Sequence, residues 1–106
     1  MTDKQYLQSF LERLYPLGEA TARLVMGDYC IYLNGKLIGL MCDGTFFLKK
    51  FDTNREHLKN CPEGCPYVGA KPLPIPDVND AAFLLEAVRL TYWGASEPKS
   101  KKKQQE

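Results

Sequence analysis

Several features that would place a chain in a class at once are missing from this sequence. No apolar run among the 106 residues approaches the ~20 that a membrane-spanning helix needs, and the polar start does not resemble a signal peptide. The 14 lysines and arginines are nearly matched by 13 aspartates and glutamates, so no global charge attracts nucleic acid or an anionic membrane. We therefore expect a cytoplasmic protein that makes no membrane contact.

The motifs of enzymes and of cofactor-binding proteins are missing as well. The sole histidine, His57, has no serine or cysteine near it in a nucleophile motif. Gly35, Gly39 and Gly44 lie in expected turns and strands, whereas a phosphate-binding loop joins a strand to a helix. We expect no catalytic residue, no cofactor and no enzymatic activity.

A metal site is one alternative that the spacing leaves open. His57, Cys61 and Cys65 repeat every four residues, which would place two ligands on one helical edge and a third across a turn. Tetrahedral zinc requires a fourth ligand, and the usual finger spacing is absent. Unpaired thiols are therefore the preferred interpretation.

The other two cysteines are also expected to be free, because cytoplasmic thiols are normally reduced. With a two-residue turn at Asn34-Gly35, Cys30 pairs with Gly39, and Cys42 lies three positions further along. Side chains alternate between the faces of a strand, so Cys30 and Cys42 are predicted to point to opposite faces. A disulfide between them would break the register.

The first half of the chain predicts a helix and then a β-meander. A capping box at Thr2 starts an amphipathic helix over residues 2–15, and residues 19–25 add at most a helical turn. The dipeptides Asn34-Gly35 and Asp43-Gly44 favour two-residue hairpin turns. Two such turns predict three antiparallel strands, at about residues 29–33, 36–42 and 45–49.

The second half predicts two further helices around a proline-rich stretch. A short helix capped by Asp52 or Thr53 runs to about Lys59. Four prolines between residues 66 and 76 confine any strand there to a sheet edge. Asp77 or Asn79 caps a last helix that has a broad apolar face and ends near residue 94.

One domain is expected, over residues 1–96, followed by a lysine-rich tail. Residues 97–106 contain no apolar side chain, and we interpret them as disordered. Lysines release counterions when they neutralise phosphates, so this tail is the candidate for nucleic-acid contact, at most weak and nonspecific. The lysines concerned are Lys99, Lys101, Lys102 and Lys103. A merely solubilising end is the alternative.

Two stretches carry a resemblance to a known family. Residues 24–40 read LVMGDYCIYLNGKLIGL, a Met-Gly turn, a tyrosine-bearing strand, a Gly-Lys hairpin and an apolar strand. Residues 66–72 read PYVGAKP, and a closing helix begins near Asp80. These motifs follow one another in this order from about Arg23 to Trp93, and together they resemble the N-terminal domain of the TfoX/Sxy regulators. Met26-Gly27-Asp28 replaces the usual Met-Phe-Gly-Gly form, and these 106 residues do not include the second, helical domain of full-length members.

The resemblance implies a fold and a role. The implied fold is a bacterial α+β domain of two layers, an antiparallel meander with an edge strand packed against N-terminal and C-terminal helices that lie mainly on one side. The implied role is regulation of competence and transcription, which we expect to proceed through protein contacts. The alternative is a chaperone-like or scaffolding homodimer unrelated to transcription, and the identity of the partner would separate the two.

Both faces of the expected meander are apolar. Counted from the two turns, Tyr29, Leu40 and Phe47 share one face, and Tyr32, Met41 and Phe46 are among those on the other. Monomers seldom expose many apolar side chains together, so we expect a homodimer in which a second copy covers part of the sheet. The alternative is one helix on each face. The candidate partner surface comprises Tyr29, Leu40, Phe47, Tyr67 and Lys71, although the last two could merely support an edge strand.

Overall fold

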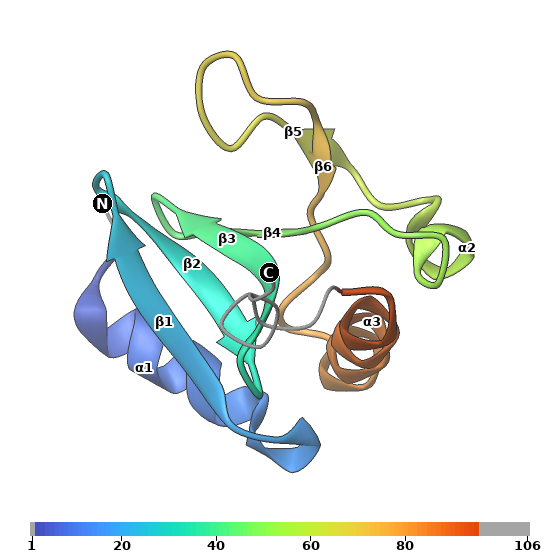
Figure 1. Cartoon of the computed structure of the whole chain (residues 1–106), viewed down its shortest axis with the longest axis horizontal. Coiled ribbons are helices and arrows are strands. Elements are labelled where there is room, and N and C mark those ends of the chain that lie inside the picture. The colour runs from blue at the N-terminus through green and yellow to red at the C-terminus, as the bar shows by residue number, and fades with distance from the viewer. Residues whose placement is uncertain (1, 96–106) are drawn as a thin grey trace, which may run out of the picture.

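A four-stranded antiparallel sheet and two long helices build most of the molecule (Figure 1). The computed structural model describes residues 2–95. The helices are α1 (Lys4–Arg13), the 3-10 turn η1 (Tyr15–Leu17), α2 (Arg55–Leu58) and α3 (Ala81–Gly94). The strands are β1 (Ala20–Val25), β2 (Asp28–Leu33), β3 (Lys36–Cys42), β4 (Thr45–Leu48), β5 (Glu63–Gly64) and β6 (Leu73–Pro74). The predicted α+β class is confirmed, and the expected tail at residues 97–106 lies outside the described residues.

The N-cap of helix α1 lies one residue later than predicted, at Asp3 and not at Thr2. The carboxylate of Asp3 accepts a hydrogen bond from the Tyr6 backbone N–H at 3.0 Å. The hydroxyl of Thr2 instead accepts from the backbone N–H of Gly44 at 2.9 Å and ties the start of the chain to the β3–β4 turn. The capping box at Thr2 was therefore wrong, because Asp3 offers a carboxylate that also complements the helix dipole.

Residues 20–25 form strand β1, whereas at most a helical turn was expected over residues 19–25. All six residues of β1 pair with β2, from Ala20 opposite Leu33 to Val25 opposite Asp28. The two strands are joined by Met26-Gly27, with φ of 53° and 90°. Positive φ at both positions marks a two-residue hairpin turn of the same kind as the two that were predicted. Methionine is an unusual residue for this conformation, so the turn carried little sequence signal.

The register between β2 and β3 contains an irregularity that the sequence did not indicate. Tyr32 pairs with Leu37, but Ile31 pairs with Gly39, so Ile38 is an extra residue in β3. Beyond this bulge every β3 and β4 side chain lies on the face opposite to the one predicted. Cys30 pairs with Leu40 and not with Gly39.

The corrected register separates the residues that were grouped on one face. Tyr29, which pairs with Met41, belongs to the inner face that also carries Phe46. Leu40 and its β4 partner Phe47 lie on the outer face. Cys30 and Cys42 share that outer face, so the argument that placed them on opposite faces was wrong.

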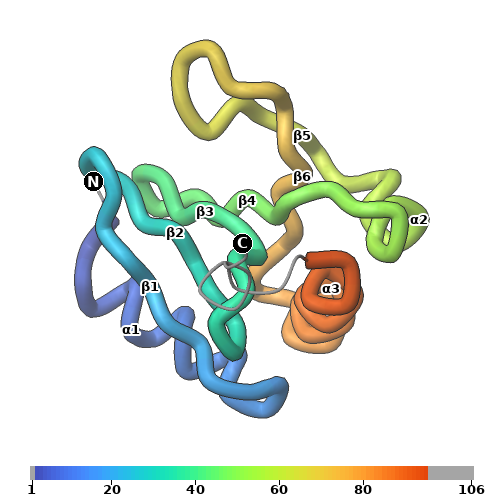
Figure 2. Tube along the Cα trace, in the orientation of Figure 1, coloured from blue at the N-terminus to red at the C-terminus, as the bar shows by residue number. Residues whose placement is uncertain are grey.

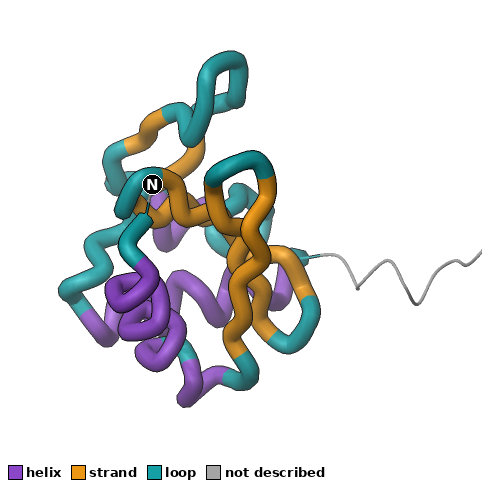
Figure 3. Tube along the Cα trace, turned by 90° about the vertical axis from the view of Figure 1, so that its left-hand side faces the viewer, coloured by secondary structure: helices purple, strands orange, loops and turns teal. Residues whose placement is uncertain are grey.

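Both long helices cover the inner face. One cluster of buried side chains includes residues of α1, of α3 and of all four strands, and within it Phe10 of α1 meets Phe46 of β4 with ring centroids 4.5 Å apart. Figure 3 shows the helices on one side of the strands. The two-layer expectation is thus confirmed, and the alternative with one helix on each face is wrong.

The second half of the chain follows its predictions more closely. β5 and β6 pair with each other in a separate two-stranded sheet, and Pro74 lies at its edge as expected. Helix α3 begins after Asp80, which accepts from the Phe83 backbone N–H at 3.2 Å. Asp77, one of the predicted caps, instead accepts from the backbone N–H of Asn79 in the preceding turn.

Candidate interaction surfaces

The outer face of the sheet is partly covered by the chain itself. Phe47 is buried although it points away from the helices, because the β5–β6 ribbon lies against it. A Cβ atom added at Gly64 would lie 3.6 Å from Phe47 Cε2 and 3.3 Å from Ile75 Cδ1. Leu40 and Tyr32 on the same face are half-buried. The face therefore offers less apolar surface than the sequence pattern suggested.

The five residues of the predicted partner surface lie in three separate places. Tyr29 is buried in the core under the helices, with 8% of its surface exposed. Leu40 and Phe47 lie on the outer face, the first half-buried and the second buried. Tyr67 and Lys71 are exposed on the loop between β5 and β6. Tyr67 and Lys71 therefore share one loop, and Leu40 and Phe47 are cross-strand partners on the outer face.

The loop between β5 and β6 projects from the body of the molecule (Figure 2). Tyr67 is 60% exposed, and the side chain of Val68 is fully exposed. A hydrogen bond of 3.1 Å from the Ala70 N–H to the Tyr67 carbonyl closes the loop, and Gly69 adopts a φ of 89° that favours glycine. The loop thus presents an aromatic and an aliphatic side chain on a hydrogen-bonded turn.

Sequence reasoning missed a second protruding apolar surface. We call Leu24, Val25 and Met26, at the turn between β1 and β2, the hairpin tip. Leu24 and Val25 are exposed, and Met26 is 97% exposed. The Met-Gly dipeptide was recognised as part of the family resemblance but was interpreted only as a backbone feature.

A cleft of about 510 Å³ lies between α2 and the start of α3, and His57 lines it together with Cys61, Asp77 and Asp80. The imidazole of His57 stacks on the ring of Phe83, with centroids 4.3 Å apart and planes inclined by 19°. Its Nε2 atom is buried and makes no hydrogen bond to the described residues.

The possible zinc ligands do not gather there. Cys65 is exposed outside the cleft, and between residues 2 and 95 no three His, Cys, Asp or Glu side chains are grouped to hold a metal ion.

The four thiols are free and differ in environment. Burial, and after it the charge of the neighbouring Asp28 carboxylate and a hydrogen bond to it, together raise the pKa of Cys42 from 9.0 to about 11. Burial also raises the pKa of Cys30 and of Cys61. Cys65 is the exposed thiol.

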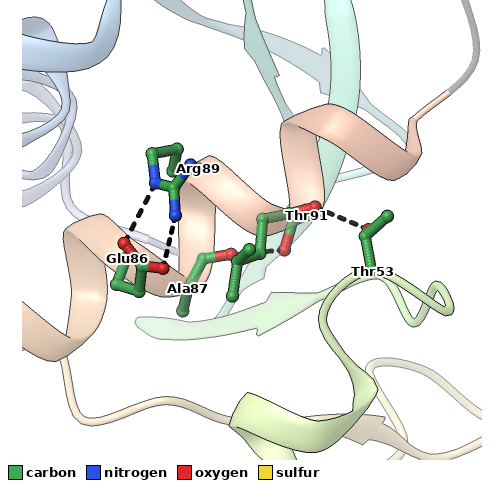
Figure 4. A network of polar contacts seen from close by, with 6 residues as sticks. Thr53, Glu86, Ala87, Arg89 and Thr91 are labelled. Atoms are coloured by element: carbon green, nitrogen blue, oxygen red, sulfur yellow. Dashed lines mark hydrogen bonds and ion pairs between the residues drawn. The ribbon is translucent and has the colours of Figure 1, made fainter.

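Helix α3 is held to the loop after β4 by polar contacts (Figure 4). The hydroxyl of Thr53 donates to the carbonyl of Leu90 at 2.6 Å. Within the helix itself, Arg89 donates two hydrogen bonds to Glu86, at 2.6 and 3.0 Å, and these lower the pKa of the Glu86 carboxyl. The Arg89 guanidinium also lies 4.9 Å from the ring centroid of the exposed Trp93.

These elements define a small two-layer α+β domain, in which helices cover one face of a β-meander. No helix between residues 2 and 95 is long and apolar enough to cross a membrane. Residues 12–96 match the family described as the TfoX N-terminal domain, and the chain belongs to this family. The resemblance noted in the sequence is confirmed.

A curated relative covers nearly the whole chain. It is 30% identical over 103 residues, which are 95% of this chain and 90% of the relative. The relative is described as an uncharacterised 12.7 kDa protein in the trpE 5′ region of Spirochaeta aurantia. The two proteins are thus similar over almost their full lengths.

Proposed function

We propose that this protein is a cytoplasmic regulatory interaction module, related in role to the TfoX regulators of competence and transcription, that acts through protein contacts. Membership of the TfoX N-terminal domain family over residues 12–96 carries this proposal. That family supports a role like that of a competence regulator. The contact mechanism rests on the surfaces described above.

Two protruding apolar surfaces support protein contacts. The hairpin tip and the Tyr67-Val68 turn expose large side chains on well-formed hydrogen-bonded turns. Single exposed apolar residues are ordinary. The hairpin tip exposes three in succession, with Leu24 and Val25 on opposite faces of the strand and Met26 in the turn, so that it presents apolar side chains on both sides. The loop adds an exposed aromatic residue, and tyrosine is enriched at interfaces.

The helices offer little for reading DNA bases. Helix α3 buries Leu84, Ala87 and Val88 against the sheet, and its exposed side carries the Glu86–Arg89 ion pair. A recognition helix needs an exposed face that enters the major groove. We therefore propose that any DNA contact is weak, salt-sensitive and made by the lysines of residues 97–106.

Partner capture from native cells tests the proposal. The tagged protein is compared with the double variant Tyr67→Ser/Val68→Ser and with the matched control Trp93→Ser, which alters an exposed aromatic residue elsewhere. We expect the wild type and the control to retain RNA polymerase or a transcription factor, and the loop variant to lose it. An unrelated client lost in the same variant would favour the scaffolding alternative.

A DNA-binding measurement tests the proposal that any DNA contact is weak and made by residues 97–106. Electrophoretic mobility shifts with the full chain and with residues 1–96 should show salt-sensitive binding for the former only. Sequence-specific binding by residues 1–96 would contradict the proposed mechanism.

A further inference from the structure

Strand β1 is an open edge of the sheet. The strand order is β1-β2-β3-β4, so β1 and β4 are the two edge strands (Figure 1). Strand β6 packs beside β4, whereas no strand of the described residues lies beside the outer edge of β1. Proteins usually protect such an edge with proline, a bulge or several charges. Over its six paired residues β1 has no proline, no register shift and one charge, that of Arg23.

The hydrogen bonds to β2 show which backbone groups of β1 face outward. The carbonyl of Glu19 accepts from the Asn34 N–H at 2.8 Å, and the Glu19 N–H donates to Asn34 Oδ1 at 2.8 Å. Bonded positions alternate along an antiparallel strand, so the odd-numbered residues of β1 face β2. The N–H and C=O groups of Ala20, Ala22 and Leu24 therefore point to the open edge.

We propose that this edge pairs antiparallel with the same edge of a second copy, with Thr21 opposite Thr21. In this register Ala20 and Ala22 exchange backbone hydrogen bonds with Ala22 and Ala20 of the second copy, which matches the groups that face outward. The odd-numbered residues then form the closely spaced, non-hydrogen-bonded pairs in which side chains meet.

Charge complementarity favours this register and identifies a second copy as the occupant. Glu19 lies opposite Arg23 of the second copy, and by symmetry Arg23 lies opposite the other Glu19. Both side chains are exposed, and neither forms an ion pair with another residue between 2 and 95. Shifting the register so that Arg23 opposes Arg23, or Glu19 opposes Glu19, would place like charges together, which destabilises a strand pair. The two sheets would become one sheet of eight strands.

This proposal differs from the dimer expected from the sequence, in which a second copy covers a sheet face. It rests on the backbone of β1 and on the charges of Glu19 and Arg23, and it does not depend on the regulatory role.

Sedimentation velocity from about 1 to 100 µM, a range that spans micromolar dissociation constants, tests it on the full chain. We expect a concentration-dependent dimer. Either Arg23→Glu or Glu19→Arg should weaken it about tenfold, because both symmetry-related pairs change from opposite to like charge. Mixing the two variants, or combining both substitutions in one chain, should restore the dimer, since opposite charges then face each other again.

A second variant separates edge pairing from charge effects. Ala22→Pro removes an N–H that points to the open edge, so circular dichroism should show a folded protein while the dimer is lost. Thr53→Ser, far from β1, is the control and should sediment like the wild type. A monomer at every concentration would overturn the proposal, and so would a dimer that none of the β1 substitutions weakens. Either result would leave the proposed regulatory function untouched, because the partner-capture variants alter the β5–β6 loop.

Discussion

The side-chain amide of Asn54 donates a hydrogen bond to the hydroxyl oxygen of Thr91 over 2.7 Å, and both residues are fully buried. The same amide donates to the carbonyl of Lys49 at 2.8 Å, and its oxygen accepts from the Phe51 N–H at 2.9 Å. The hydroxyl of Thr91 in turn donates a hydrogen bond to the carbonyl of Ala87 at 2.7 Å. Asn54 thus ties the segment between β4 and α2 to helix α3 through one network of hydrogen bonds.

Replacing Asn54 by alanine should lower the free energy of unfolding by about 3 kcal/mol, because buried donors and acceptors lose their partners. Urea unfolding followed by circular dichroism measures this. The exposed Asn60→Ala is the matched control, with an expected change within about 0.5 kcal/mol. A double-mutant cycle with Thr91→Val should show coupling between the two sites. An Asn54→Ala protein as stable as the control would mean that the network does not form in solution.

Gly39 is required by the close approach of β4. A Cβ atom there would collide with the carbonyl oxygen of Phe47, a backbone atom that cannot swing aside. Gly39→Ala should therefore cost about 2 kcal/mol or more in thermal or urea unfolding. At Gly64 the nearest atom is the flexible end of Ile75, at 3.3 Å, so Gly64→Ala should cost clearly less. Equal losses at both positions would contradict the assigned register.

The side chain of Asn34 stabilises the fold through a hydrogen bond, in addition to adopting the positive φ that the turn requires. Its Oδ1 accepts from the Glu19 N–H, and its φ is 51°. Asn34→Gly keeps the positive φ but removes this hydrogen bond, so stability should fall by about 1 kcal/mol. Met26 holds the first position of the equivalent turn, with φ of 53° and an exposed side chain. Met26→Gly relieves backbone strain alone and should be neutral or stabilising. The changes in stability caused by the two substitutions should thus differ in sign or by about 1 kcal/mol when measured by thermal unfolding.

The environments of the cysteines predict an order of reaction with a thiol reagent. Cys65 is exposed, whereas Cys42 is buried and its pKa is raised to about 11. The thiolate is the reactive form, so at pH 8 Cys65 should be labelled first and Cys42 only after unfolding. Peptide mass spectrometry after timed labelling assigns the sites. Titration of the denatured protein should find all four thiols, and a missing pair would show a disulfide that the structure does not contain.

The raised pKa of Cys42 also predicts a pH dependence of stability. The thiol ionises near pH 9.0 when unprotected and near pH 11 in the folded protein, so between these values the folded state holds the proton that the unfolded state has lost. The contribution of this thiol to the free energy of unfolding is therefore fully present below about pH 9 and is lost as the pH rises towards 11. The free energy of unfolding, measured with urea between pH 8 and 10.5, should fall less steeply with pH for Cys42→Ala than for the wild type. Parallel curves would argue against the burial of this thiol.

The sequence predicted those parts of the fold that depend on local residues. Asn34-Gly35 and Asp43-Gly44 form the predicted turns because both positions of each adopt positive φ. The last helix ends at Gly94, near the expected boundary. The sequence did not identify the N-caps correctly. Asp3 and Asp80 each follow directly after a predicted cap, because several polar side chains that can cap a helix lie close together at these helix starts.

The parts that were missed depend on contacts distant in sequence. β1 is a strand because β2 pairs with it, although Ala20 and Ala22 have no strand preference of their own. The extra residue Ile38 follows from packing, since it is fully buried while the register shifts around it. That one residue places Leu40 and Phe47 on the outer face and separates them from Tyr29, with which they were predicted to share a face. The burial of Asn54 likewise depends on Thr91, 37 residues away.

Each of the four strands pairs with its neighbour in the chain, through turns of two residues. Sheets made of consecutive hairpins have low contact order, and low contact order favours fast folding. The meander can therefore form early, while its inner face still lacks the side chains that α3 provides. Leu84, Ala87 and Val88 complete that face only after the proline-rich segment has crossed back. During synthesis on the ribosome, we therefore expect the nascent domain to pass through a state with a formed sheet and an incomplete core, in which apolar side chains are exposed to chaperones and proteases.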